Sequence, residues 1–125
     1  WLILQQDKPE DFVIATGTTT SVREFIKLAF GELGIELKFT GEGVEEKGIV
    51  AACNNPEYQL PSGKVVVAVD PEYFRPTEVE LLIGDATKAK EKLGWKPRYD
   101  LAALVKEMVD SDVKNLKKTL AQSKA

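Results

Sequence analysis

The sequence of 125 residues predicts a small mixed α/β fold. Two segments with helical spacing, 22–33 and 101–116, are separated by short apolar runs typical of strands, of which Val65–Val69 is the clearest. A chain of this length forms one domain and can bury roughly two thirds of the surface that it exposes when unfolded. We therefore expect residues 1–125 to form one lobe.

The first third of the chain contains a predicted strand and the best-marked helix. The apolar residues Trp1–Leu4 are typical of the end of a helix whose beginning is missing, and the apolar run Phe12–Ala15 predicts a buried strand. Ser21 and Glu24 have the spacing of a capping box, in which each side chain accepts a hydrogen bond from the other residue's backbone N–H. A helix is therefore expected to begin after Ser21 and to end at Gly34 in a left-handed turn.

The middle of the chain is expected to contain two strands joined by irregular segments. Apolar and polar residues alternate over Ile35–Phe39, which predicts a half-buried strand. The glycines and charges of 41–48 predict a loop, and the turn-rich segment 51–64 predicts a surface excursion. The strand Val65–Val69 follows that excursion.

Two helices are predicted in the last third of the chain. Asp85 is expected to be the N-cap of a short helix over 86–93, which Gly94 ends. Asp100 is expected to cap the final helix, and a disordered tail is expected over 119–125. One apolar stripe of the final helix is predicted to pack in the core; its members are Leu101, Leu104, Val105, Met108, Val109, Val113 and Leu116.

Composition excludes several classes of protein. Hydrophobic residues make up 43% and charged residues 30% of the chain, as in ordinary folded domains. No apolar run approaches the roughly 20 residues that cross a bilayer, and the formal net charge of −3 provides no basic field for nucleic acid. The N-terminal residues lack the basic leader and cleavage site of a secretion signal. We expect a cytoplasmic protein that binds neither nucleic acid nor a membrane.

The cysteine and histidine contents narrow the chemistry further. Cys53 is the only cysteine and there is no histidine, which excludes an intramolecular disulfide, a Cys/His zinc site and His-dependent catalysis. Cys53 is expected to be a small buried hydrophobe or an ordinary loop thiol rather than a nucleophile. No metal site is predicted.

The segment after the Val65–Val69 strand has the residues of a nucleotide-diphosphate site. Arg75 supplies a planar fork of donors that matches phosphate oxygens, and Pro76 fixes its own φ and holds Arg75 extended. The carboxylate of Glu78 can accept hydrogen bonds from the two hydroxyls of a ribose. The alternative is a helix entry with a surface ion pair, which the same spacing allows.

The motifs of cofactor binding and hydride transfer are missing. Neither G-x-G-x-x-G nor G-x-x-x-x-G-K-[ST] occurs, so the sequence does not encode the cofactor-binding half of a Rossmann fold. No tyrosine is followed four residues later by the lysine that would acidify its phenol. Tyr58, Tyr73 and Tyr99 are followed at that spacing by Ser62, Thr77 and Ala103. The chain therefore has ligand-binding residues but no proton-transfer or hydride-transfer groups.

Several motifs occur in a fixed order along the chain. They are Asp-Phe-Val-Ile-Ala-Thr-Gly at 11–17, Ser-Val-Arg-Glu-Phe at 21–25, Gly-Val-Glu-Glu-Lys-Gly at 43–48, Val-Asp-Pro-Glu-Tyr-Phe-Arg-Pro-Thr-Glu-Val at 69–79, Gly-Asp-Ala-Thr-Lys-Ala at 84–89 and Leu-Gly-Trp-Lys-Pro at 93–97. Together, over residues 1–113, they resemble the C-terminal part of bacterial GDP-mannose 4,6-dehydratases, which are extended short-chain dehydrogenase/reductase enzymes. The resemblance implies a small mixed α/β substrate-binding lobe that lacks the family's N-terminal Rossmann domain.

The resemblance implies that the whole protein is a lyase of nucleotide-sugar metabolism, acting in GDP-fucose biosynthesis. Complete members oxidise the mannose of GDP-mannose at C4 with bound NADP, eliminate water across C5 and C6, and return the hydride to C6, giving GDP-4-keto-6-deoxymannose. Their N-terminal domain holds NADP, a catalytic Thr and Glu, and a Tyr/Lys pair. This chain alone is therefore expected to be inactive, with no catalytic residue and no cofactor site, and the full-length protein to form a dimer or tetramer.

The resemblance also implies roles in substrate binding. Arg75 matches the family arginine expected on the diphosphate, and Glu78 matches the acid expected on the guanosine ribose. Tyr73 would border the sugar or the phosphate, or else be a packed aromatic at the end of a strand. Arg23 and Lys47 could approach the ligand; the alternatives are an arginine paired with nearby acids and a charge in a solvated loop.

Three functions stay open at this point. The first is the GDP-sugar-binding portion of a GDP-mannose 4,6-dehydratase. The second is a freestanding, non-catalytic module that binds a nucleotide sugar. The third is a structural or interaction domain, in which Arg75 and Glu78 would be exposed and directed away from any cleft.

Overall fold

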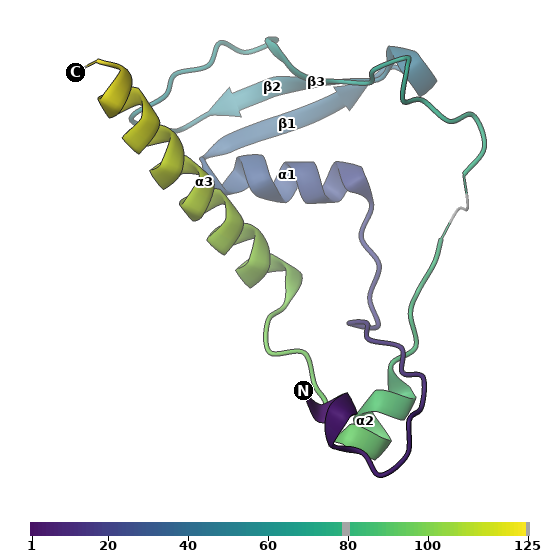
Figure 1. Ribbon diagram of the computed structural model, residues 1–125. Helices are drawn as coiled ribbons and strands as arrows, with labels where there is room; N and C mark the ends of the chain where they lie inside the picture. The colour runs from purple at the N-terminus through teal and green to yellow at the C-terminus, as the bar shows by residue number, and fades with distance from the viewer. Residues whose placement is uncertain (79–80, 125) are drawn as a thin grey trace. The chain divides into compact units, whose positions relative to one another are not determined.

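The computed structural model describes residues 1–78 and 81–124. These residues form two compact units, one of residues 1–20 with 81–101 and a larger one of residues 21–78 with 102–124. Figure 1 shows the helices and strands of both units. Among the described residues, no helix is long and apolar enough to span a membrane.

The larger unit opens with α1, Val22–Glu32, which begins as its capping signals predict. The Oγ atom of Ser21 accepts a hydrogen bond from Glu24 N at 3.2 Å, and Oε2 of Glu24 accepts one from Ser21 N at 3.3 Å. The chain leaves the helix through Gly34, whose φ of +71° lies in the left-handed region. The apolar face of α1 packs on the sheet through Ile26, Phe30 and Leu33.

Three antiparallel strands form one sheet in the order β1-β2-β3 (Figure 1). β1 spans Ile35–Thr40, β2 spans Lys47–Cys53 and β3 spans Val65–Ala68. A short 3₁₀ helix, η2, covers Gly43–Glu45 between β1 and β2. The core that α1 covers is small; its buried members are Ile35, Leu37 and Val50.

Strand β2 was not predicted, because its first two residues, Lys47 and Gly48, are of types common in loops. The predicted loop 41–48 overlaps the first two residues of β2, and the predicted excursion 51–64 overlaps its last three. Gly48 is buried in β2, where a Cβ would lie 3.0 Å from Cβ of Val67 and 3.2 Å from Cε1 of Phe39. Close packing, and not a turn, therefore favours a glycine at this position, since a Cβ would displace its neighbours by a few tenths of an ångström.

Helix α3, Leu101–Ser123, begins directly after Asp100, as predicted. It continues through the region where a tail was expected, so the predicted disorder of 119–125 does not hold for residues 119–123. The hydroxyl of Thr119 donates to the carbonyl of Asn115 at 3.1 Å, one turn back along the helix. This side-chain bond accompanies the helix, whose last residue is Ser123.

The apolar stripe of α3 divides into two rows. Val105 is buried, and the residues four positions before and after it on the same face are half-buried. Leu104, Met108 and Leu116, which were predicted to pack with them, are 46%, 45% and 59% exposed. The packed row therefore has a spacing of four residues and consists of Leu101, Val105, Val109 and Val113.

The smaller unit contains the 3₁₀ helix η1, Leu2–Gln5, and helix α2, Thr87–Leu93, in which Ala89 is fully buried. Asp85 is not the N-cap of α2, since the next residue holds that position. Its Oδ1 atom nevertheless accepts a hydrogen bond from Thr87 N at 2.9 Å. The helix begins one residue later than predicted, while Asp85 still satisfies a free N–H of the first turn.

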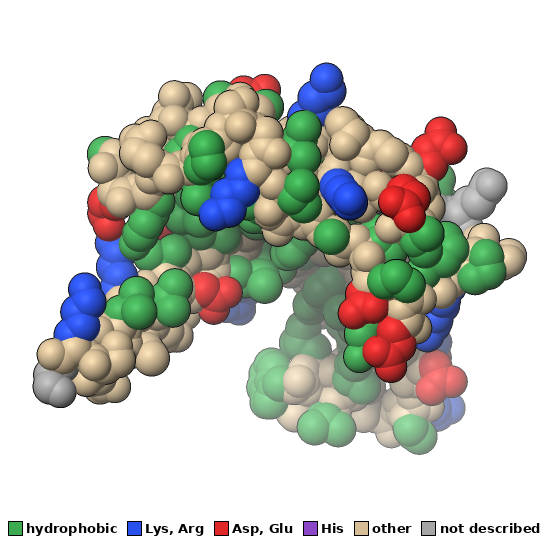
Figure 2. Space-filling view, turned by 90° about the horizontal axis from the view of Figure 1, so that it is seen from above, with side chains coloured by type: hydrophobic (Ala, Val, Ile, Leu, Met, Phe, Trp, Pro, Cys, Tyr) green, Lys and Arg blue, Asp and Glu red, His purple; other side chains and the backbone are tan. Residues whose placement is uncertain are grey.

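The predicted strand over Phe12–Ala15 does not form. Val13 and Ile14 are 55% and 51% exposed, and no strand lies among the described residues of the smaller unit to pair with them. A strand is held by hydrogen bonds to a neighbouring strand, so this apolar run stays irregular. Apolar side chains reach the surface elsewhere as well, as the green atoms in Figure 2 show.

Candidate functional site

The predicted nucleotide-binding segment follows β3 through a tight turn. Tyr73 N donates to Asp70 O at 3.1 Å, and Glu72 N donates to Oδ1 of the same aspartate at 3.0 Å. Pro71 stands at the second position of this turn, where its fixed φ is favoured. The turn brings the chain to Arg75 within seven positions of the end of β3.

The structure excludes the helix-entry alternative for Arg75 and Glu78. Residues 74–78 are not helical, and neither side chain forms an ion pair with a described residue. Both residues are exposed, and Tyr73 is 77% exposed rather than packed at the end of the strand. The donors of Arg75 and the acceptors of Glu78 are therefore accessible to a ligand, and the same exposure also fits the third function, a structural or interaction domain.

The sheet register brings Lys47 to the same end of the larger unit as this turn. Lys47 is the first residue of β2 and lies opposite Ala68, the last residue of β3, two positions before Asp70. It also lies opposite Thr40, the last residue of β1. Lys47 is therefore not a loop charge: it is an exposed side chain at the strand ends beside the Arg75 segment.

Arg23 forms an ion pair, which was the alternative to a ligand contact. Its Nε donates to Oε1 of Glu46, and its Nη2 donates to Oε2 at 2.9 Å. Such a two-point contact uses the planar geometry of both groups. The side chain of Arg23 is 60% exposed and that of Glu46 only 16%. The pair joins the first turn of α1 to the residue that follows η2.

The pair between Arg23 and Glu46 predicts that the stability of the turn around Glu46 depends on pH. The hydrogen bonds from Arg23 hold the pKa of Glu46 below its usual value of 4.5. A carboxyl whose pKa is lowered by folding stabilises the folded state above its unfolded pKa, and that contribution is lost as the pH falls through the folded pKa. We expect hydrogen exchange at residues 43–48 to accelerate, after correction for intrinsic rates, as the pH falls from roughly 6 to 3. Glu46→Gln should show a weaker dependence, and equal profiles would contradict the assignment.

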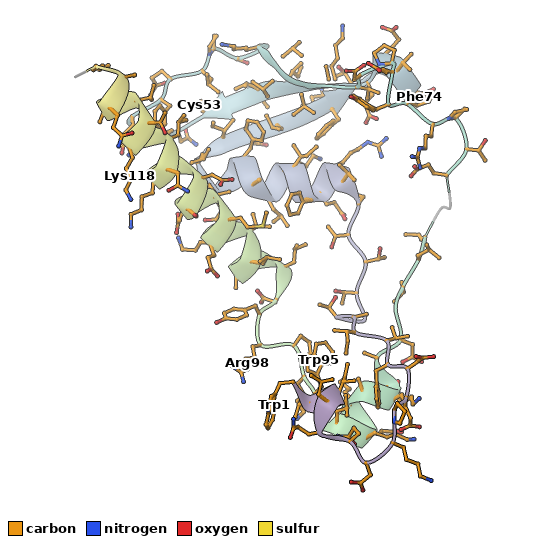
Figure 3. The ribbon with its side chains drawn as sticks, in the orientation of Figure 1. Trp1, Cys53, Phe74, Trp95, Arg98 and Lys118 are labelled. Atoms are coloured by element: carbon orange, nitrogen blue, oxygen red, sulfur yellow. The ribbon has the colours of Figure 1, made fainter. Side chains whose placement is uncertain are left out.

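Sequence reasoning missed Glu46, Asp70 and Phe74 as parts of this region. Asp70 precedes a proline and could have been found as a turn signal. Glu46 could not, because its partner stands 23 positions earlier in the chain. Phe74 lies near η2, since a Cβ built on Gly43 would lie 3.7 Å from its Cζ, and Figure 3 shows its ring beside that turn.

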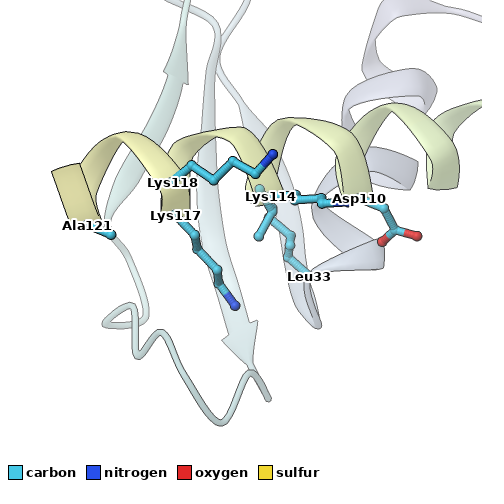
Figure 4. Close-up of a pocket in the computed structure, with 7 residues that line it drawn as sticks. Leu33, Asp110, Lys114, Lys117, Lys118 and Ala121 are labelled. Carbon is cyan, nitrogen blue, oxygen red and sulfur yellow. The ribbon is translucent and has the colours of Figure 1, made fainter.

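A separate groove of about 550 Å³ lies on α3 of the larger unit (Figure 4). Its charged residues are Asp110 and three lysines, one of which, Lys117, already lies 2.7 Å from Oε2 of Glu57. Neither Arg75 nor Glu78 lines it. The lining residues are Leu33, Asp110, Val113, Lys114, Lys117, Lys118 and Ala121.

Cys53 is half-buried at the end of β2, where it packs against the core and its Sγ–H donates to Tyr58 O at 3.0 Å. Within the described ranges, no cluster of carboxylates or thiols could hold a metal ion. The residues present do not form a dinucleotide loop for NADP either. Only one glycine precedes each of the two helices α1 and α2, namely Gly17 and Gly84. A dinucleotide loop requires several glycines at fixed spacing between a strand and a helix.

Comparison with known proteins agrees with the resemblance of the motifs. The family described as GDP-mannose 4,6 dehydratase matches residues 1–108. The chain is 55% identical over 115 residues to the GDP-mannose 4,6-dehydratase of Vibrio cholerae and 50% identical over 113 residues to the GDP-mannose 4,6 dehydratase of Homo sapiens. These matches cover 91% and 90% of the chain but only 31% and 28% of the two relatives, so the chain spans less than a third of their length. The chain belongs to the GDP-mannose 4,6-dehydratase family.

Proposed function

We propose that this chain is the GDP-sugar-binding portion of a GDP-mannose 4,6-dehydratase. The observation that carries the proposal is the turn after β3, which leaves Arg75 and Glu78 exposed and without protein partners among the described residues. Both residues stand in the motif that resembles the family's substrate-binding segment. An exposed arginine with a free donor fork is suited to a phosphate group.

In this proposal the residues bind and orient the substrate. The guanidinium of Arg75 donates to the oxygens of the diphosphate, and the carboxylate of Glu78 accepts from the ribose hydroxyls. Lys47, at the adjoining strand ends, adds positive charge beside the diphosphate, and Tyr73 borders the sugar or the phosphate. NADP and the groups that transfer protons and hydride belong to the remainder of the polypeptide, because the residues described do not form a dinucleotide loop.

The activity is tested on the complete polypeptide that carries this sequence. Incubation with GDP-mannose and NADP should give a product lighter by one water, detected by mass spectrometry. The 125-residue chain alone should give none. Unchanged GDP-mannose in the reaction of the complete polypeptide would contradict the proposal.

Calorimetry with GDP separates this function from that of a freestanding module. If the remainder of the polypeptide supplies part of the pocket, the isolated chain should bind GDP much more weakly than the complete polypeptide. Equal affinities would favour a self-sufficient binding module instead.

Replacing Glu78, the residue proposed to bind the ribose, should weaken nucleotide binding by an amount that depends on the ribose hydroxyls. We expect Glu78→Gln in the complete polypeptide to weaken GDP binding about tenfold, because the side chain loses its charge but keeps one acceptor oxygen. 2′-deoxy-GDP lacks one of the two hydroxyls, so Glu78→Gln should weaken the binding of this nucleotide by about threefold or less. Isothermal titration calorimetry measures both. Glu72→Gln, at an exposed acid in the preceding turn, is the control and should leave both affinities unchanged. An equal loss for the two nucleotides would exclude the ribose contact.

A further inference from the structure

The pair between Arg23 and Glu46 connects two parts of the larger unit that are far apart in sequence. Arg23 is the second residue of α1, and its backbone is fixed by the capping box at the start of that helix. Glu24, the acid next to it, is already used in the capping box, where it accepts from Ser21 N. The guanidinium reaches instead to Glu46, which ends η2.

The segment 41–46 forms a tight turn that this pair holds against α1. Glu45 N donates to Glu42 O at 3.0 Å, and Glu46 N donates to Gly43 O at 3.3 Å. Gly41 has a φ of +82°, and a Cβ at that position would overlap the carbonyl of Glu45. The backbone of the turn is therefore closely packed around Gly41.

Two contacts connect this turn to the segment that carries Arg75. The ring of Phe74 lies beside η2, since a Cβ built on Gly43 would lie 3.7 Å from its Cζ. Lys47, the residue after Glu46, is held in register opposite Ala68 at the end of β3. The turn that begins at Asp70 therefore lies between the Lys47–Ala68 pairing and the approach of Phe74 to η2. Phe74 is the residue that precedes Arg75.

From these contacts we infer that Arg23 and Glu46 are positioning residues for Arg75. The Nε and Nη2 atoms of Arg23 donate to Glu46, and in this inference Arg23 acts on the ligand through η2 and Phe74. The inference rests on the proposed function, because it assumes that Arg75 binds the diphosphate of a nucleotide. It assigns to the pair the task of holding Arg75 in the orientation that the diphosphate requires.

Single and double variants of the complete polypeptide test the inference. Arg23→Gln and Glu46→Gln should each weaken GDP binding about fivefold, and the double variant should be no weaker than either single one, because the two residues act as one unit. Arg23→Lys keeps the charge but loses the fork, and should recover part of the affinity. In steady-state assays, KM for GDP-mannose should rise while kcat is unchanged, as for an interaction made equally in the ground and transition states.

The result for Glu46→Gln separates positioning from direct contact. If Arg23 contacted the nucleotide itself, Glu46→Gln would release its fork and leave GDP binding unchanged or tighter, which would overturn the inference. Lys117→Gln removes another surface ion pair of the same unit, with Nζ 2.7 Å from Glu57, and should leave GDP affinity unchanged. If Lys117→Gln weakens GDP binding equally, the effect is one of general stability and the inference is wrong.

Arg75→Ala, measured in parallel, distinguishes this inference from the function on which it rests. Loss of GDP affinity in Arg75→Ala with no change in Arg23→Gln and Glu46→Gln would reject only the positioning role. No change in any of the three variants would reject the proposed function itself.

Discussion

Arg75→Ala in the complete polypeptide should weaken the binding of GDP and GDP-mannose by about 2 to 4 kcal/mol, or roughly 30- to 700-fold. Arg75 is exposed and without an ion-pair partner among the described residues, so its donors are available to the diphosphate. A charged phosphate that loses a two-point contact stays partly desolvated and unpaired in the complex, which makes the cost larger than that of a neutral hydrogen bond. Isothermal titration calorimetry with GDP measures this change directly.

Two further variants show whether GDP binding depends on the planar guanidinium of Arg75 or only on its positive charge. Arg75→Lys keeps the positive charge, but an ammonium cannot make the planar two-point contact. Its affinity for GDP should therefore lie between those of the wild type and Arg75→Ala. Arg98→Ala removes an exposed arginine of the smaller unit and should change the affinity by about twofold or less. Equal losses in Arg75→Ala and Arg98→Ala would show a general electrostatic effect and contradict the assigned contact.

Leu37→Ala should destabilise the larger unit by about 3 kcal/mol, through a mechanism unrelated to ligand binding. Leu37 is 6% exposed and belongs to the small core in which Ile35 and Val50 are the other buried residues. Removing most of its side chain leaves a cavity that so small a core cannot fill by relaxation. The loss should appear as faster hydrogen exchange of the β1 and β2 amides, measured by mass spectrometry on the complete polypeptide.

An exposed leucine provides the matched control for this core substitution. Leu120 of α3 is 51% exposed, so Leu120→Ala should change the same exchange rates by an amount equivalent to about 0.5 kcal/mol or less. Unchanged protection of β1 and β2 in Leu37→Ala would contradict the view that these three residues form the core of the unit.

The local signals of the sequence were sufficient where one short segment determines the structure. The capping box at Ser21 and Glu24 and the left-handed turn at Gly34 follow from residues a few positions apart, and both are confirmed. The alternation over Ile35–Phe39 likewise gave β1, because one face of that strand packs under α1.

Elements that depend on distant partners were not predicted correctly. Strand β2 contains Gly48, which indicates a loop until the close approach of Val67 and Phe39 is known. The run Phe12–Ala15 has the apolar character of a strand but no pairing strand among the described residues of its unit. In both cases the decisive contact lies outside the segment, so no local pattern could reveal it.

In the candidate site, too, features that depend on local sequence were predicted and features that depend on distant contacts were not. The roles of Arg75 and Glu78 were predicted from residue type and spacing and stay predictions, because the exposure of both side chains fits a ligand site and a structural domain equally. The alternative weighed for Arg23, a pair with a nearby acid, is the one found, but its partner Glu46 comes close only after α1 and η2 have folded. The closeness of Phe74 to η2 depends on tertiary structure too and could not be predicted from the sequence.

The central claim is that Arg75 and Glu78 hold the two ends of one nucleoside diphosphate. A crystal structure of the complete polypeptide with GDP bound tests it most directly. We predict the Arg75 guanidinium within hydrogen-bonding distance of the diphosphate oxygens, and the Glu78 carboxylate within the same distance of the ribose hydroxyls. GDP bound elsewhere, or bound with these two side chains directed into solvent, would contradict the claim.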